Sequence, residues 1–308
     1  MTARYLIIDT YLLYWGKGQR KDLTAHLGVG NVTATRIFSD YSANNPGALL
    51  MDPSAKAYVY TDSFTPITSP TPETVLPLMA YGVEHKQIKT TGFGPPTPSA
   101  VLAALCPEKV SAITRAMVSK MGVKISYSSN TSGPSERTVY PHALFIGGGA
   151  WYFRAFDAQS SKYRTFRFSR VKGVGKSEGG PEHSFKTVDA EWNSEITLTL
   201  APHTKYKWKD ALAMDLGLTD KPVSNLTVNK VMAGHVLTDL RVDCSPDASL
   251  NPNQYFLQLG PMLLVLPMQC GVLRYLPRSH WKIYLKAFLL SLNLKYGLPE
   301  IHIAHWSH

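Results

Sequence analysis

Aromatic residues and arginines are concentrated in two short segments near the middle of the chain. Trp151-Tyr152-Phe153-Arg154 comes first, and a second segment runs from Tyr163 to Arg170. Because side chains alternate between the two faces of a strand, one face should carry four of them: Arg164, Phe166, Phe168 and Arg170. Arginines beside aromatic rings suit a phosphate-bearing or single-stranded nucleic-acid ligand. Aromatic side chains filling a small barrel, with arginines solvating its exterior, would produce the same pattern.

Motifs for catalysis or metal binding lack essential members. The segment 173–177 ends like a phosphate-binding loop, but Arg170 stands where the first glycine of that motif is required. His142, His203 and His235 are isolated, and the three cysteines form no CxxC pair. There is no HExxH or GxSxG motif. We therefore expect no catalytic residues, no metal ligands and no cofactor, and we do not expect an enzyme.

The composition, with 44% hydrophobic and 18% charged residues among 308, is that of a globular protein of two or three domains. Its net charge of +10 favours a polyanionic partner. The basic excess is uneven: residues 1–62 hold six Lys/Arg against five Asp/Glu, whereas residues 120–176 hold ten against two. Arg4, Asp9 and Lys17 interrupt any signal-peptide core, and the apolar stretch 283–294 is too short to span a bilayer. We expect a soluble cytoplasmic protein with no membrane partner.

The N-terminal periodicities predict three helices followed by a hairpin. Residues 1–15 place apolar side chains on one helix face, residues 19–27 form a short second helix, and residues 31–41 form a third. The segments 48–51 and 55–60 alternate and are joined by Asp52-Pro53-Ser54, which suits a turn. The order predicts a winged helix-turn-helix over residues 1–62. Three short helices packed together for structure alone would share the same spacing.

In a helix-turn-helix the third helix enters the major groove of DNA. Thr33, Thr35 and Arg36 are our candidates for contacts to base edges. Four more residues are candidates for contacts to the phosphate backbone, the last of them on the wing: Arg20, Lys21, Asn31 and Lys56.

The remaining segments complete a multidomain α+β protein. Residues 63–118 read as a linker rich in Pro, Ser and Thr followed by connecting helices. Residues 119–187 contain short β segments that predict a small barrel or sandwich, and residues 188–259 alternate strands and helices. Residues 260–308 remain unassigned.

Several of these motifs resemble known families. Arg137-Thr-Val-Tyr-Pro141-His142 resembles the R-x-x-x-P-H strand of the WYL domain, a sensor domain of bacterial transcriptional regulators. Trp151-Tyr152-Phe153 stands at the naming triplet, with Phe for Leu, and Arg154-Ala155 and Arg164-x-Phe166-x-x-Ser169-Arg170 resemble the rest of the signature. Leu27-Gly28-Val29 through Tyr41, Leu50-Met-Asp52 and Lys56-x-Tyr58 resemble the winged helix of the BrxR/CapW group of WYL regulators. Asp189-x-x-Trp192 and Leu200-x-Pro202-His203 resemble that group's C-terminal extension.

The resemblance implies an Sm-like β-barrel and a homodimer that represses a phage-defence operon, such as a BREX operon, including its own promoter. Such a repressor binds double-stranded operator DNA at an inverted repeat and is released by an anionic effector such as a nucleotide or single-stranded nucleic acid. Carried over residue by residue, the ligand-binding candidates are Tyr127, Ser128, His142, Trp151, Arg154, Arg164, Phe166 and Arg170. The sequence departs from the family at Gly30, where a serine usually caps the third helix, and after Leu259. The alternative is an accessory module whose barrel binds single-stranded nucleic acid.

Overall fold

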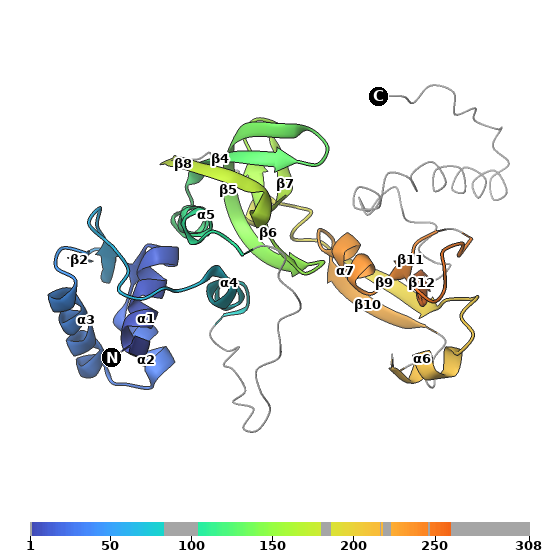
Figure 1. Ribbon diagram of the computed structural model, residues 1–308, viewed down its shortest axis with the longest axis horizontal. Coiled ribbons are helices and arrows are strands. Elements are labelled where there is room, and N and C mark those ends of the chain that lie inside the picture. The colour runs from blue at the N-terminus through green and yellow to red at the C-terminus, as the bar shows by residue number, and fades with distance from the viewer. Residues whose placement is uncertain are drawn as a thin grey trace. The chain divides into compact units, whose positions relative to one another are not determined.

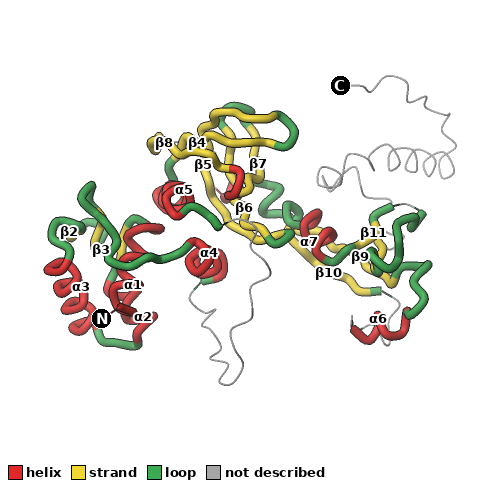
Figure 2. The backbone as a smooth tube through the Cα atoms, viewed as in Figure 1, coloured by secondary structure: helices red, strands yellow, loops and turns green. Residues whose placement is uncertain are grey.

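The structure is a computed structural model that describes residues 2–82, 104–179, 186–215, 217, 223–245 and 247–259. The chain divides into two compact units, Met1–Val188 and Asp189–His308 (Figure 1). Figure 2 shows that helices precede the first large sheet along the chain, and that strands and helices alternate after it. The unassigned segment 260–308 lies outside the described residues. None of the described helices is both long and apolar enough to cross a bilayer.

The first unit begins with a winged helix-turn-helix, here called the head. Helix α1 (Thr2–Thr10) continues into a π-helical turn, η1 (Tyr11–Trp15), and α2 (Arg20–Leu27) and α3 (Asn31–Asn44) follow. Strands β1 (Lys17–Gly18), β2 (Leu49–Asp52) and β3 (Ala57–Tyr60) form an antiparallel sheet in the order β1-β3-β2. The predicted winged helix is thus present.

Local sequence explains the boundaries of the short helix α2. The side chain of Gln19 and that of Asp22 cap its first turn reciprocally, and Gly28 ends it in the left-handed conformation at φ 67°. Gly30 begins α3 without a side-chain cap. The four predicted inward residues of α3, Ala34, Ile37, Phe38 and Tyr41, are all buried.

A carboxylate on α1 ties the head together. Asp9 is fully buried and accepts hydrogen bonds from the Tyr41 hydroxyl of α3 and from the backbone N–H and hydroxyl of Thr68, both at 2.6 Å. Burial, with the neighbouring Asp9, raises the pKa of Tyr41 above its usual value, so the phenol stays a donor. This single group therefore joins two helices to the segment that leaves the wing.

Two helices connect the head to the next sheet. Helices α4 (Pro72–Tyr81) and α5 (Pro107–Ser119) each carry proline in the first turn, where it costs no backbone hydrogen bond. The side chains of Val110 and Ile113 of α5 lie in one apolar cluster with Tyr14 of η1 and Val123 of the following sheet. A guanidinium nitrogen of Arg115 donates to the Leu13 carbonyl at 3.2 Å. Helix α5 thus packs against both neighbours.

The central domain is a five-stranded antiparallel sheet in the order β7-β6-β5-β4-β8. The strands are β4 (Gly122–Ser129), β5 (Gly133–Gly147), β6 (Ala150–Asp157), β7 (Lys162–Arg167) and β8 (Val171–Glu178). Gly148 and Gly149, at φ 57° and 66°, make the tight turn between β5 and β6. A 3-10 turn, η2 (Phe168–Arg170), separates β7 from β8.

The second unit has a mixed sheet in the order β10-β9-β12-β11. Its elements are β9 (Glu195–Pro202), α6 (Lys209–Asp215), β10 (Ser224–Asn229), α7 (Ala233–Asp239), β11 (Val242–Asp243) and β12 (Leu257–Leu259), preceded in the first unit by the 3-10 turn η4 (Lys186–Val188). His203 and Asp243, both fully buried, join the end of β9 to β11 through a 3.1 Å contact. The chain as a whole is a multidomain α+β protein.

We expect Asp9→Asn to lower the free energy of unfolding of the full chain by about 2 kcal/mol or more, because hydrogen bonds to a charged group are each worth roughly 1.5–3 kcal/mol. Urea denaturation followed by circular dichroism measures the loss. The control is Asp40→Asn, at an exposed position on α3, which should change stability by no more than about 0.5 kcal/mol. Equal losses in the two variants would contradict the assigned role of Asp9.

Candidate DNA-reading and effector surfaces

The head exposes six of its seven candidate DNA contacts: Arg20, Lys21, Asn31, Thr33, Arg36 and Lys56. Thr35 is half-buried, and its hydroxyl donates to the Asn31 carbonyl at 3.0 Å. Its hydroxyl proton is therefore used within α3, while its oxygen can still accept a hydrogen bond.

The wing is held close to the start of α2. The side-chain amide of Gln19 donates to the Ala55 carbonyl at 3.2 Å and to the Lys56 carbonyl at 3.5 Å. In the turn itself, hydrogen bonds from the Ser54 hydroxyl and the Ala55 N–H hold the pKa of the Asp52 carboxyl below its usual value. Lys56 adopts a positive φ of 48° at the end of this turn. The geometry brings Lys56 to the same side of the head as the N-terminal end of α2.

The expected arginine face on the second aromatic segment is wrong. Strand β7 ends at Arg167, so Arg170 lies in the 3-10 turn and does not continue the alternation. Phe166 and Phe168 are buried against Phe153, with ring centroids 5.3 and 4.9 Å away. They belong to the hydrophobic core rather than to a ligand-facing surface.

Arg164 is engaged by a buried acid. Its Nε lies 3.3 Å from the carboxylate of Asp157 and donates to the Ser160 hydroxyl at 2.8 Å. Arg137 also donates to the same Asp157 oxygen, at 2.7 Å, and the Asp157 side chain is fully buried. The Nε of Arg164 is therefore already used, although 49% of its side chain is exposed.

Arginines and aromatic rings do meet on the opposite face of β6 and β7. The strand register pairs Tyr152 with Arg167 and Arg154 with Thr165. The guanidinium carbon of Arg154 lies 5.9 Å from the centre of the Tyr163 ring, and that of Arg167 lies 6.0 Å from the Tyr152 ring. We call this set the arginine–tyrosine face: Tyr152, Arg154, Tyr163, Thr165 and Arg167.

Two polar atoms of this face are buried without a hydrogen bond. In the described part of the chain, neither Thr165 Oγ1 nor Arg167 Nε has a hydrogen-bond partner. The sequence interpretation missed both residues because it extended the strand through Arg170 and so followed the other alternation. The register of β6 and β7 identifies Thr165 and Arg167, because residues paired across two strands lie on the same face of the sheet.

Two other candidates have structural contacts, and a third lies on the opposite face of its strand. The Tyr127 hydroxyl accepts a hydrogen bond from the Arg167 backbone N–H at 3.1 Å, and its ring meets Phe166 edge to face. Trp151 is half-buried against the core, 6.5 Å from the ring of Tyr81 in α4. Ser128, half-buried, points away from the face of β4 that carries Tyr127.

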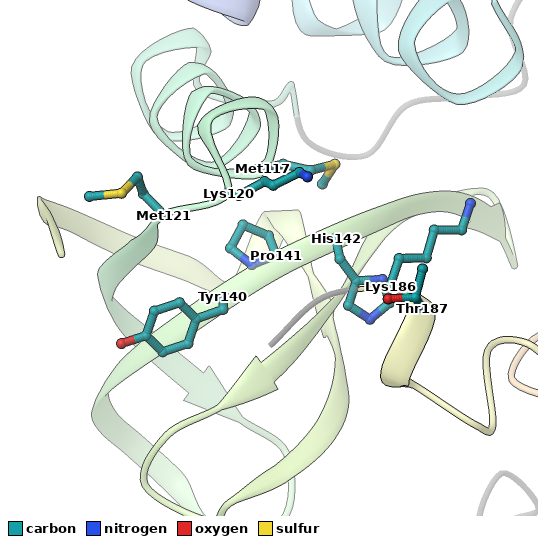
Figure 3. A pocket seen from close by; sticks show the side chains of 8 residues that line it. All are labelled: Met117, Lys120, Met121, Tyr140, Pro141, His142, Lys186 and Thr187. Carbon is teal, nitrogen blue, oxygen red and sulfur yellow. The ribbon is translucent and has the colours of Figure 1, made fainter. Parts of the chain in front are cut away.

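His142 borders both the arginine–tyrosine face and a cavity. Its ring lies 5.6 Å from that of Tyr163. The cavity, of about 230 Å³, is formed by the end of α5, strand β5 and η4 (Figure 3). Figure 3 shows Lys186 and His142 together on one side and Tyr140 on the other. The lining residues are Met117, Lys120, Met121, Tyr140, Pro141, His142, Lys186 and Thr187. Within the described ranges, no group of three His, Cys, Asp or Glu residues is placed to hold a metal ion.

Three family models match the chain in succession. The BrxR transcriptional regulator winged helix-turn-helix domain matches residues 1–80, and the WYL domain matches residues 108–175. The BrxR transcriptional regulator C-terminal dimerization domain matches residues 195–260.

Curated relatives share much of this length. The DNA-binding transcriptional repressor CapW of Stenotrophomonas maltophilia is 26% identical over 258 residues, which are 78% of this chain and 83% of that protein. The protein of the same name from Escherichia coli (strain KTE188) is 29% identical over 207 residues, 65% of this chain and 69% of that protein.

Solved structures resemble the chain less closely. Proteasome accessory factor B/C of Arthrobacter aurescens covers 84% of this chain at 18% identity and a TM-score of 0.26. A CRISPR Cas-related protein covers 63% at 9% identity and a TM-score of 0.30. The chain spans 44% and 53% of those two proteins. The chain thus carries, in this order, a BrxR-type winged helix-turn-helix domain, a WYL domain and a BrxR-type C-terminal dimerization domain, and it is similar in this to the CapW repressors.

Proposed function

We propose that the chain is a homodimeric DNA-binding repressor of a phage-defence operon, including its own promoter. It reads an inverted repeat through the head and is released when an anionic nucleotide or nucleic acid binds the WYL domain. The observation that carries the proposal is the division of α3 into a buried apolar face and an exposed polar face that holds Thr33 and Arg36. The names of the CapW relatives, DNA-binding transcriptional repressors, point the same way.

The head has groups for both kinds of DNA contact. The guanidinium of Arg36 can donate two hydrogen bonds to O6 and N7 of guanine, and Thr33 can reach the edge of a neighbouring base. Arg20 and Lys21 at the start of α2, and Lys56 on the wing, are placed for phosphates on either side. Base contacts would then supply sequence specificity, and phosphate contacts would orient α3.

Specific binding should require two heads. One head holds six Lys/Arg against five Asp/Glu, so it can neutralise few phosphates and gains little nonspecific affinity. A two-fold dimer presents two such heads to the two halves of an inverted repeat. The match of residues 195–260 to a dimerization domain supports this arrangement.

The effector site proposed here is the arginine–tyrosine face together with His142. Arg154, which is fully buried, and Arg167, which is half-buried, supply positive charge beside the Tyr163 and Tyr152 rings. An anion would also satisfy the buried Nε of Arg167 and hydroxyl of Thr165. Of the residues carried over from the family, Arg154 and His142 lie at this site, whereas Arg164 and Arg170 lie apart from it.

Helix α5 offers a route from the effector to the head. Its last turn lines the cavity beside His142, and its middle packs with Tyr14 of the head in one apolar cluster. The hydrogen bond from Arg115 to the Leu13 carbonyl fixes the same contact. A ligand that shifts α5 would therefore move the head, which couples effector and operator binding thermodynamically.

We expect Arg36→Ala to weaken binding to the duplex upstream of the protein's own gene by about tenfold or more, because each bidentate pair with guanine is worth roughly 1–3 kcal/mol. Fluorescence anisotropy with a labelled duplex measures the affinity. The matched control is Arg4→Ala, which removes the same charge from an exposed position on α1. The reading helix is misassigned if Arg36→Ala binds as tightly as the unaltered protein does.

We expect Arg167→Ala to bind the upstream duplex normally but to resist release by short single-stranded oligodeoxythymidylate. Loss of Arg167 removes a charge from the effector site without touching the head. The control is Arg164→Ala, whose arginine is already engaged by Asp157, and it should respond to the oligonucleotide more nearly as the unaltered chain does. The same anisotropy assay, with increasing oligonucleotide, measures release. If Arg164→Ala resists release and Arg167→Ala does not, the effector binds beside Arg164 and the proposed site is wrong.

The arginine–tyrosine face also favours a second candidate, an accessory module whose WYL domain binds single-stranded nucleic acid. Stacking rings and cations are the usual elements of such sites. This function predicts salt-dependent binding of single strands that is stronger than binding of the upstream duplex. If the protein is a repressor, it should bind the upstream duplex more strongly than single strands.

A further inference from the structure

Among the described residues of the head, the most exposed large apolar side chain lies on the proposed reading helix. Val32, in the first turn of α3, has 80% of its surface exposed. Successive residues of an α-helix are rotated by about 100° around its axis. Val32 is therefore on the opposite side of α3 from the fully buried Tyr41, and the residues nearest it on that outermost line are Arg36 and Ser39.

Folding gives no reason for a valine at this position. The side chain buries little surface, and β-branched residues lose rotamer freedom in a helix compared with alanine. Its neighbours Asn31, Thr33 and Arg36 are exposed and polar or charged. The other large apolar residues exposed in the described part of the head lie on other elements: Leu6 on α1, Leu50 and Met51 on β2, and Tyr60 on β3.

A single apolar side chain in polar surroundings is too small for a protein-binding patch, which would need a contiguous apolar area. The side chain of Val32 is instead suited to contact one methyl group. In the major groove of DNA, the C5-methyl group of thymine is the apolar feature that a side chain can contact.

We propose that Val32 is a specificity-determining residue that contacts the C5-methyl group of a thymine in each half-site of the operator. This inference rests on the proposed function, since it requires α3 to enter the major groove. Residues near the N-terminus of a recognition helix are those that reach base edges. Because Arg36 lies one turn along the same line, the thymine lies close to the guanine that Arg36 reads.

The experiment uses the full chain and the duplex upstream of its own gene. Each thymine in turn is replaced by deoxyuridine, which removes the C5-methyl group and leaves base pairing unchanged. For the unaltered protein, one replacement within a half-site should weaken binding about fourfold, the factor expected for one buried methyl group. Replacements elsewhere in the duplex should have little effect.

The variant Val32→Ala completes a double-mutant cycle. It should bind the thymine duplex about sixteenfold more weakly, fourfold for each of the two heads, and should no longer distinguish thymine from deoxyuridine at that position. Alanine favours the helix, so loss of folding does not explain a weaker affinity. The control Val188→Ala makes the same change at a residue that is 52% exposed outside the head, and it should keep the full preference for thymine.

The outcomes separate this inference from the proposed function. If the duplex binds but no single deoxyuridine matters, or if Val32→Ala keeps the same preference for thymine, the contact with Val32 is wrong while the repressor stands. If the full chain does not bind the duplex at all, both are wrong.

Discussion

The buried carboxylate of Asp9 is the interaction on which the architecture of the head depends. It accepts hydrogen bonds from Tyr41 on α3 and from Thr68 beyond the wing, so one charged group fixes the rotation of α3 against α1. Burial of an uncompensated carboxylate is costly, and the structure tolerates Asp9 only while these donors are in place. The hydrogen bond from Tyr41 to Asp9 also decides which side of α3 is exposed. With Tyr41 turned inward, Val32 and Arg36 must face outward.

A second buried acid shapes the WYL sheet. Asp157 holds Arg137 and Arg164 at one end of β6, so that two of the cations in the most basic part of the chain share one negative charge. The cations that stand beside tyrosine rings are then Arg154 and Arg167, on the opposite face. The local charge excess therefore overstates the positive charge that is available to bind an anion.

Helical periodicity predicted the head well, since the inward set of α3 from Ala34 to Tyr41 is buried as expected. Strand periodicity failed at β7 because no residue type marks the point where a strand becomes a 3-10 turn at Phe168. The alternation was therefore continued past the end of the strand, and the face of β7 that carries Thr165 and Arg167 was not considered. The engagement of Arg164 was also unpredictable, because it depends on Asp157, which only the pairing of β6 with β7 brings near.

The cluster shared by the head and the WYL sheet bears on how such regulators can diversify. Tyr14 is fully buried and donates to the Pro70 carbonyl at 3.0 Å, and it packs with Val110 and Ile113 of α5. The head is thus not an independent cassette that ends with its wing. An exchange of DNA-reading modules between related regulators would have to carry α4 and α5 along with residues 1–62, or else supply a new surface to cover Tyr14. Shuffling at the apparent boundary in the linker would separate residues that fold as one core.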